Sequence, residues 1–256
     1  MLSTIAESVR SQLSLRSYEG WEREIEALLK LRAGGIGFRK ALKRGRENFI
    51  LEIKRTSPSN HGVVHSVDVH ATAACFQRCG AAAVSVLTEG QYFGGSLADL
   101  ATARESVTLP LLRKDFIVDK LQIAEAKAYG ADAVLLITAI LSDHELRTFI
   151  EFAASIQIDA LVEVHSEAEL ARAVDAGAGI IGVNSRDLHT MKVDLSSAAQ
   201  LLRQVPDHCV RIAESGLKLR SDIVMMRDAG ADAFLVGSSV MHADNMTEKI
   251  AELMGV

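Results

Sequence analysis

The sequence has few cysteines, no long apolar run and no excess of positive charge. Its three cysteines among 256 residues, Cys75, Cys79 and Cys209, fit reduced thiols in a cytoplasmic protein. The longest apolar stretch, residues 133–141, is interrupted by Thr138 and is far shorter than the roughly 20 residues that span a bilayer. A net charge of -5 disfavours nucleic acid and membranes as partners, although it still permits a small anionic substrate.

Targeting and metal-binding signals are missing as well. The first 13 residues lack the basic segment and apolar core of a signal peptide, so we expect a cytoplasmic location. Cys75 and Cys79 stand four apart on a predicted helix, but no His or carboxylate pattern completes a tetrahedral site. We therefore predict no metal.

What the sequence does have is a regular alternation of short apolar runs and longer amphipathic segments. The runs are spaced roughly 20 to 33 residues apart, which is typical of βα units. The eight runs cover residues 49–54, 82–89, 110–115, 133–138, 160–165, 180–185, 209–215 and 233–238. Eight such units in 256 residues fit a closed (β/α)8 TIM barrel, which needs roughly 250 residues.

Helix signals between the runs support this fold. Three S-x-x-[DE] patterns predict capping boxes that open helices, at Ser96–Asp99, Ser142–Glu145 and Ser166–Glu169. Four similar junctions predict glycine-capped helix ends about every 50 residues, as in a repeat of two βα units. Their glycines are Gly80, Gly130, Gly177 and Gly230.

An open doubly wound sheet is the alternative fold, but it would more often carry a G-x-G-x-x-G turn after its first strand. Here residues 57–59 read Ser-Pro-Ser. Without a linker or a low-complexity tract, we expect one α/β domain over residues 1–256. Residues 1–48 would form an extension of extra N-terminal helices, and residues 49–256 would form the barrel.

Polar side chains gather near the predicted carboxyl ends of five strands. Alternation along each strand would point them into the barrel, whereas their neighbours would face the helices. The inward set is Glu52, Lys54, Lys114, Glu163, Asn184 and Glu214, and the outward set is Ile53, Val162, Val164, Ile181, Val183 and Val236. Burying unpaired charges costs several kcal/mol, and active sites of this fold lie at that rim. A catalytic site is therefore favoured over the alternative, an ion network that merely plugs the barrel.

The loops after the last two strands predict a phosphate site. Ser215-Gly216 follows strand seven and Gly237-Ser238 follows strand eight, where many barrels bind phosphate through backbone N–H groups. Either pair alone could be a turn or a helix cap. Together they favour a phosphorylated small-molecule substrate.

These motifs resemble those of indole-3-glycerol phosphate synthases, enzymes of tryptophan biosynthesis. The resemblance runs from about Phe49 to Met241 and includes, in order, EIKRTSPS, SVLTEGQYFGGSL, LRKDFIVDKLQI, LVEVH, IGVNSRDL, AESG and FLVGSSVM. It implies a decarboxylating lyase that closes the indole ring of 1-(2-carboxyphenylamino)-1-deoxyribulose 5-phosphate, with release of carbon dioxide and water. It implies no cofactor.

The resemblance also assigns roles to residues. Lys114 would be the general acid of ring closure, with Glu163 and Lys54 sharing the acid and base roles of dehydration in an order left open. Glu52 and Asn184 would orient the substrate. The remaining assignments are Lys54, Ser57 and Arg186 for the anthranilate carboxylate, Phe93, Phe116 and Leu135 for the aromatic ring, Glu214 for the substrate, and Ser215, Gly216, Gly237, Ser238 and Lys54 for phosphate.

Departures and rival functions remain open at this stage. Residues 60–62 read Asn-His-Gly where many members have Lys-Gly, and Ser185 replaces a common second asparagine. His165 is expected to line the rim rather than to bind zinc. One rival is phosphoribosylanthranilate isomerase, which needs a Cys–Asp pair at strand ends, whereas Cys209 begins a strand. The other is a non-catalytic ligand-binding paralogue. The oligomeric state, a monomer included, and association with other tryptophan-pathway enzymes are left open.

Overall fold

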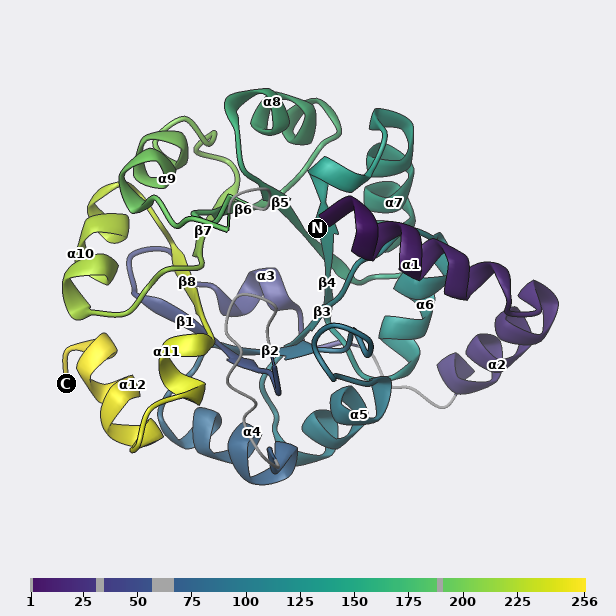
Figure 1. The fold of residues 1–256 in the computed structure, drawn as a ribbon, viewed down its shortest axis with the longest axis horizontal. Helices are drawn as coiled ribbons and strands as arrows, with labels where there is room; N and C mark the ends of the chain where they lie inside the picture. The colour runs from purple at the N-terminus through teal and green to yellow at the C-terminus, as the bar shows by residue number, and fades with distance from the viewer. Residues whose placement is uncertain (1, 31–34, 57–66, 188–190) are drawn as a thin grey trace.

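Eight parallel strands close into a barrel in the computed structural model, which describes residues 2–30, 35–56, 67–187 and 191–256 (Figure 1). Each strand pairs with its neighbours in sequence, and β1 pairs with β8. The strands are β1 (Asn48–Ile53), β2 (Ala83–Leu87), β3 (Leu111–Lys114), β4 (Ala133–Ile137), β5 (Asp159–Val164), β6 (Ile180–Asn184), β7 (Val210–Glu214) and β8 (Ala233–Val236). The closure confirms the predicted (β/α)8 barrel and rules out the open sheet.

Helices form a ring around the strands, and further helices come from the predicted N-terminal extension. The extension contributes α1 (Leu2–Ser14), α2 (Tyr18–Lys30) and α3 (Phe38–Ala41). The ring consists of α4 (Val69–Arg78), α5 (Leu97–Ser106), α6 (Lys120–Ala128), the 3-10 helix η1 (Thr138–Ile140), α7 (Asp143–Ser155), α8 (Glu167–Asp175), α9 (Leu195–Leu202), α10 (Arg220–Asp228), α11 (Ser238–Met241) and α12 (Met246–Met254). Among the described residues, no helix is long and apolar enough to cross a membrane.

The core has two layers because successive side chains of a strand face opposite sides of the barrel wall. The predicted outward positions all lie in the layer between strands and helices: Ile53, Val162, Val164, Ile181, Val183 and Val236. A second apolar cluster, which includes Ile50, Leu112 and Leu161, fills the interior. Towards the carboxyl ends of the strands, the charged side chains of Glu52, Lys114 and Glu163 take the place of apolar ones, and the candidate site lies there.

The helix signals are confirmed in part. Gly80, Gly130, Gly177 and Gly230 all have positive φ, as the predicted left-handed helix ends require. Ser142 and Glu145 form a complete capping box, in which each side chain bonds the other residue's backbone. Ser96 and Ser166 also accept a backbone hydrogen bond. Their acidic partners, however, bond elsewhere: Asp99 pairs with Arg55, and Glu169 bonds His165.

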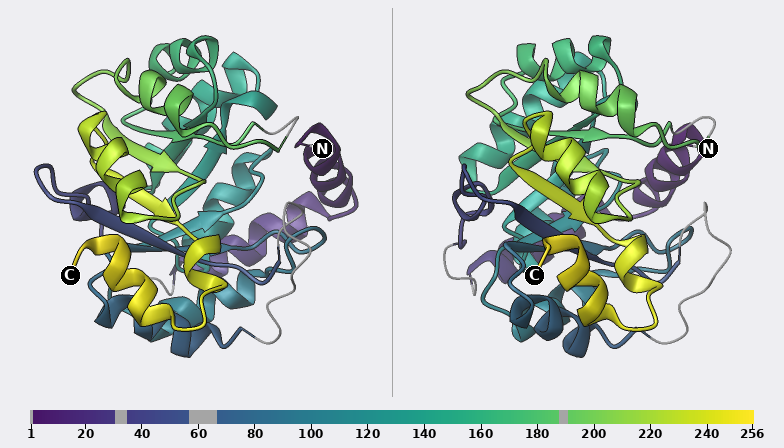
Figure 2. Two further views of the ribbon diagram at one scale, coloured as in Figure 1. Left: turned by 60° about the vertical axis from the view of Figure 1, so that its left-hand side comes forward. Right: turned by 90° about the vertical axis from the view of Figure 1, so that its left-hand side faces the viewer.

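The N-terminal extension reaches two parts of the barrel. Helix α1 lies at the end of the barrel towards which the strands point (Figure 2). Helix α2 packs on α6, where Trp21 Nε1 donates to Glu125 Oε1 over 2.8 Å. Glu125 Oε2 also accepts from Arg113 of β3, at 3.0 Å. The extension is therefore tied through buried polar contacts to the strand that carries Lys114.

Candidate active site

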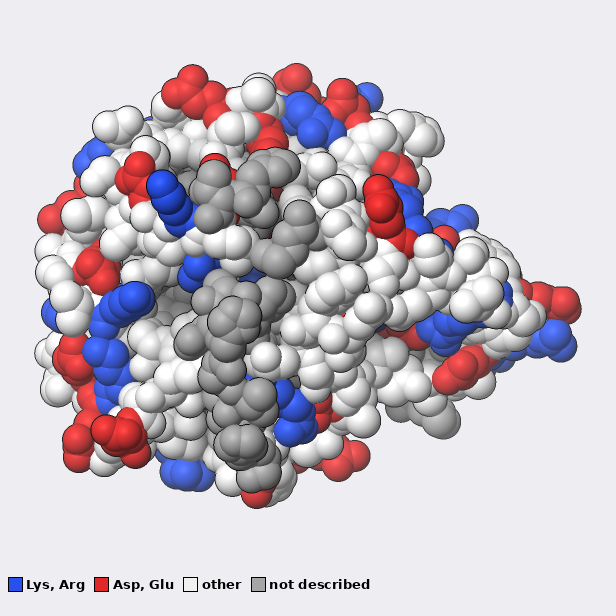
Figure 3. Space-filling model, in the orientation of Figure 1, with Lys and Arg blue, Asp and Glu red and all other residues white. Residues whose placement is uncertain are grey.

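A cavity opens at the carboxyl ends of the strands and gathers the predicted site residues. Fourteen of the fifteen predicted residues line it: Glu52, Lys54, Phe93, Lys114, Phe116, Leu135, Glu163, Asn184, Arg186, Glu214, Ser215, Gly216, Gly237 and Ser238. The fifteenth, Ser57, lies outside the described residues, as do Asn60 and His61. The face in Figure 3 carries both Lys and Arg and Asp and Glu side chains.

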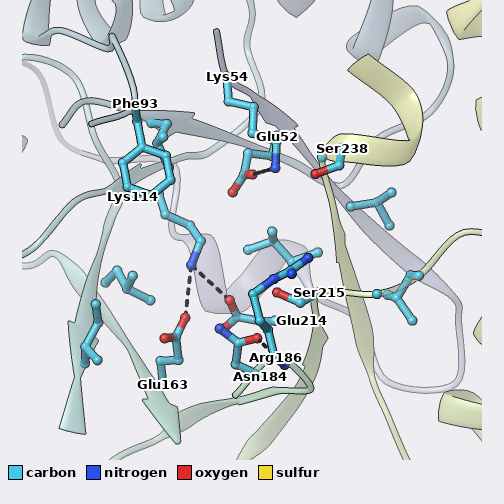
Figure 4. A pocket seen from close by; sticks show the side chains of 18 of the residues that line it. Glu52, Lys54, Phe93, Lys114, Glu163, Asn184, Arg186, Glu214, Ser215 and Ser238 are labelled. Carbon is cyan, nitrogen blue, oxygen red and sulfur yellow. Dashed lines mark hydrogen bonds and ion pairs between the residues drawn. The ribbon is translucent and has the colours of Figure 1, made fainter. Parts of the chain in front are cut away.

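Lys114 stands between two carboxylates at the centre of the cavity. At the end of β3, its Nζ donates to Glu163 Oε2 and to Glu214 Oε2, each over 3.1 Å (Figure 4). Glu163 comes from β5 and Glu214 from the end of β7, and both are buried. A short side chain could not reach these strands, whereas lysine extends across the mouth of the barrel.

The charges of this cluster shift the pKa values of its members in opposite directions. Burial alone would lower the pKa of Lys114, but the carboxylates of Glu163, Glu214 and Glu52 outweigh it and raise that pKa. Burial would raise the pKa of Glu163, but Lys114 and His165 lower it. For Glu214, burial prevails over the attraction of Lys114, and the nearby Glu163 adds to it, so the pKa rises to about 7. Lys114 is therefore protonated at neutral pH, and Glu214 is the carboxylate that most readily takes a proton.

A second ion pair lies beside this cluster. Lys54 Nζ is 3.3 Å from Glu52 Oε1, and both side chains are largely buried. The sequence placed Lys54 within the first strand, but β1 ends at Ile53, and Lys54 is the next residue. Gly237, at the end of β8, packs so closely on Glu52 that a Cβ there would lie 3.1 Å from the Cβ of Glu52. The backbone directly after the last strand thus packs against the Glu52 side chain of the first strand.

An apolar wall faces these charges. The rings of Phe93 and Phe116 have centroids 6.1 Å apart, and Leu135 of β4 continues the surface. Leu2 and Ile5 of α1 line the same cavity. Sequence reasoning missed these two residues, because their amphipathic helix indicates a buried face and not what it packs against. The wall is suited to a flat aromatic ring.

The ends of β7 and β8 form a loop pair suited to an anion. Ser215 and Gly216 have φ values of 65° and 74°, in the left-handed region that favours glycine, and Ser215 holds this conformation despite its side chain. The hydroxyl of Ser185 donates to the carbonyl oxygen of Ser215 over 2.8 Å, so Ser185 supports this loop. Gly237 and Ser238, where α11 begins, complete the pair. Among the described residues, no group of three His, Cys, Asp or Glu side chains could hold a metal ion.

Arg186 offers a positive charge in the cavity. Its Nη1 donates to the carbonyl oxygen of Met191 over 3.0 Å, and Asn184 accepts its backbone N–H. Burial lowers the pKa of its guanidinium, and within the described part of the chain no carboxylate forms an ion pair with it. This guanidinium can therefore pair with a carboxylate of a ligand.

His165 lies behind the cavity instead of lining it. It follows β5 and stands between two carboxylates, with Nδ1 3.1 Å from Glu169 Oε2 and Nε2 3.4 Å from Glu163 Oε1. It thus lies at the rim of the barrel, but it is not among the residues that line the cavity. Burial would lower the pKa of His165, but the two carboxylates raise it to about 10.

Solved structures of other proteins share the barrel. The chain superposes on a thiamine phosphate pyrophosphorylase from Pyrococcus furiosus with a TM-score of 0.60 at 18% identity, covering 82% of this chain and 94% of that one. A structure of the tryptophan synthase α2β2 complex, also from Pyrococcus furiosus, matches with a TM-score of 0.62 at 16% identity and covers 82% and 98%. At these identities the likeness shows the fold alone.

Sequence comparisons identify the family. Indole-3-glycerol phosphate synthase of Aquifex aeolicus is 45% identical over 235 residues, which cover 91% of either chain. The Koribacter versatilis enzyme of the same name is 42% identical and covers 99% of this chain and 98% of its own. The family model described as indole-3-glycerol phosphate synthase matches residues 2–253. The chain, with its acidic and basic side chains around one barrel mouth, therefore belongs to the indole-3-glycerol phosphate synthase family.

Proposed function

We propose that Lys114 is the general acid in the reaction of this family, the closure of 1-(2-carboxyphenylamino)-1-deoxyribulose 5-phosphate to indole-3-glycerol phosphate. In ring closure an aromatic carbon attacks the substrate ketone, and negative charge develops on the ketone oxygen. The observation that supports Lys114 most directly is its position between two buried carboxylates, which keep it protonated. A developing alkoxide is basic enough to take a proton even from an ammonium group of raised pKa.

The later steps need a base and a second acid. After ring closure the intermediate loses carbon dioxide and then water, and the loss of water requires both groups. Glu163 and Lys54 are the residues proposed for this pair. Lys54 Nζ lies 3.3 Å from Glu52 Oε1 and lines the cavity. Glu52 and Asn184 both line the cavity and are proposed to orient the amine and hydroxyl groups of the substrate.

The two ends of the substrate fit different parts of the cavity. Phe93, Phe116 and Leu135 are proposed to hold the anthranilate ring, and Arg186 its carboxylate, because a guanidinium offers two parallel donors. The phosphate is proposed to bind at Ser215, Gly216, Gly237 and Ser238, together with Lys54, which follows β1 next to β8. The proposal for Ser57 rests on the resemblance alone.

Two rival functions find less support. Phosphoribosylanthranilate isomerase would need a cysteine at the carboxyl end of a strand, whereas Cys209 directly precedes β7 and its thiol faces the carbonyl oxygen of Ala178. A non-catalytic paralogue should have lost an acid or a base, but Lys54, Lys114 and Glu163 all line the cavity. We propose further that the whole chain works as one domain.

The test is turnover by the purified protein. Formation of indole-3-glycerol phosphate, followed by ultraviolet absorbance or fluorescence without added metal, is expected for the unaltered chain. Lys114→Met should lower kcat by about 100- to 10,000-fold, the usual contribution of a general acid, while substrate still binds. Lys249→Met, which changes a lysine paired with Glu252 on α12, is the control. Near-native turnover in Lys114→Met would show that another group is the acid.

A further inference from the structure

The residue of interest is His165, which the proposed reaction does not use directly. It directly follows β5, two residues after Glu163, and its Nε2 lies 3.4 Å from Glu163 Oε1. Its side chain is only 13% exposed and does not line the cavity. It does not enclose the substrate, so its role must lie in its contacts with its neighbours.

Two carboxylates approach the imidazole from opposite sides. Nδ1 is 3.1 Å from Glu169 Oε2, and Nε2 is 3.4 Å from Glu163 Oε1, an ion-pair distance without hydrogen-bond alignment. A neutral imidazole has one N–H, whereas the imidazolium has two. Only the imidazolium can present an N–H to each carboxylate, and the pair raises the pKa of His165 to about 10 although burial opposes this.

The first turn of α8 fixes the histidine in place. Glu169 Oε2 accepts the backbone N–H of His165 over 2.8 Å as well as facing its ring. The backbone N–H of Glu169 in turn donates to Ser166 Oγ over 3.2 Å. The Glu169 side chain thus bonds and orients His165, and it does not bond the backbone of Ser166 as the capping-box pattern predicts.

Glu163 consequently has a cation at each of its oxygens. Lys114 Nζ donates to Oε2, and His165 faces Oε1. Three further carboxylates act on this cluster: Glu214 of β7 shares Lys114, Glu52 of β1 acts on Lys114, and Glu169 of α8 holds His165. Two further cations, Lys54 beside Glu52 and Arg186, line the same cavity. Once Lys114 has given its proton to the substrate it is neutral, and His165 is then the cation that still faces Glu163.

We propose that His165 is a positioning residue that, as an imidazolium held by Glu169, keeps Glu163 anionic and oriented to act as the base of dehydration. The inference rests on the proposed function, and it resolves the order of roles that the sequence leaves open: Glu163 takes the proton and Lys54 gives one. In the resting site the lowered pKa of Glu163 agrees with this, since His165 contributes to it alongside Lys114.

The test compares His165→Gln with the unaltered protein, since glutamine keeps a donor at similar length but has no charge. We expect kcat to fall about tenfold or more and KM to change less than about threefold. We also expect the acid limb of the kcat–pH profile to move to higher pH, because Glu163 becomes easier to protonate. His144→Gln, on the exposed start of α7, is the matched control. An unchanged kcat and pH profile, or a change in KM alone, would overturn the proposal.

Two further variants separate charge from packing. His165→Ala should regain activity with added imidazole only where imidazole is protonated, and equal rescue by the neutral base would refute a role for charge. Glu169→Gln leaves the histidine in place and should move the acid limb in the same direction, so the proposal stays testable even if His165 variants fold poorly. No turnover by the unaltered chain would contradict the proposed function itself. Normal turnover with unaffected variants would refute only the role of His165.

Discussion

Gly182 of β6 is expected to determine the position of the Glu214 carboxylate in the active site without contacting the substrate. Its Cα packs directly against the Glu214 side chain, and a methyl group there would overlap Glu214 Oε1. The added Cβ would also lie 3.0 Å from Glu214 Cδ and 3.1 Å from Leu161 Cδ1. Gly182→Ala therefore perturbs the carboxylate that holds Lys114, although Gly182 is not among the residues that line the cavity.

The size of the effect follows from these distances. Nonbonded carbon atoms rest about 3.5–4.0 Å apart, so Glu214 Cδ must move by about 0.5–1 Å and Oε1 by more. The hydrogen bond between Glu214 Oε2 and Lys114 Nζ, now 3.1 Å, cannot survive such a shift unchanged. Overpacking costs about 1–3 kcal/mol of stability, whereas a 1 Å misplacement in an active site can cost about 100-fold in rate. Because the Glu214 side chain is flexible, we expect a loss of stability near the lower end of the range of about 1–3 kcal/mol. We expect a large part of the about 100-fold loss in rate.

The assay is steady-state turnover together with urea unfolding of the same preparations. Gly182→Ala should lose about 10- to 100-fold in kcat while losing no more than about 1–2 kcal/mol of stability. Gly20→Ala in α2 is the control, because a Cβ there lies no closer than 3.4 Å to its neighbours. A Gly182→Ala enzyme with native kcat would show that Glu214 has no part in placing Lys114. A large loss of stability with native kcat in the folded fraction would refute the reasoning in the same way.

Two further predictions concern the loop and the pH dependence. Ser215→Gly should relieve the left-handed strain at φ 65° and stabilise the fold by up to about 1 kcal/mol in thermal or urea unfolding. It should also raise KM through the lost hydroxyl, and an unchanged KM would remove Ser215 from the phosphate site. Glu214, with a pKa raised from 4.5 to about 7, binds in the folded state a proton that the unfolded chain releases. Its contribution to the unfolding free energy is therefore fully present below about pH 4.5 and falls as the pH rises to about 7. Urea unfolding across this window should show the decline in the unaltered protein relative to Glu214→Gln, and parallel curves would contradict the raised pKa.

The barrel and most site residues could be predicted because they depend on local periodicity. Alternation along β5 puts Val162 and Val164 outside and Glu163 inside whichever strand pairs with it, so the inward carboxylate is visible in the sequence. The same holds for Glu52, next to the outward Ile53. Glycine at helix ends is equally local, because the left-handed conformation is a property of one residue.

Contacts that depend on closure of the barrel could not be predicted this way. Lys114 meets Glu163 and Glu214 across 49 and 100 residues of sequence, and that meeting depends on the stagger of all eight strands. The packing of Leu2 of α1 over the mouth is likewise unmarked in its helix. The role of Glu169 could not be predicted from its S-x-x-E pattern either. That pattern is typical of a capping box, but the Glu169 side chain bonds His165, while its backbone N–H donates to Ser166.

The two carboxylates around Lys114 show how different surroundings shift the pKa values of chemically equal groups in opposite directions. Glu163 and Glu214 stand at the same 3.1 Å from its ammonium, yet the pKa of the first is lowered and that of the second is raised. Behind Glu163 stands His165, a cation, whereas behind Glu214 stands Gly182, which leaves Oε1 buried without a hydrogen-bond partner among the described residues. Burial without a second cation favours the neutral acid, and burial with one favours the anion. The residues behind the two carboxylates, together with the repulsion between the carboxylates, thus favour the anion at Glu163 and the neutral acid at Glu214.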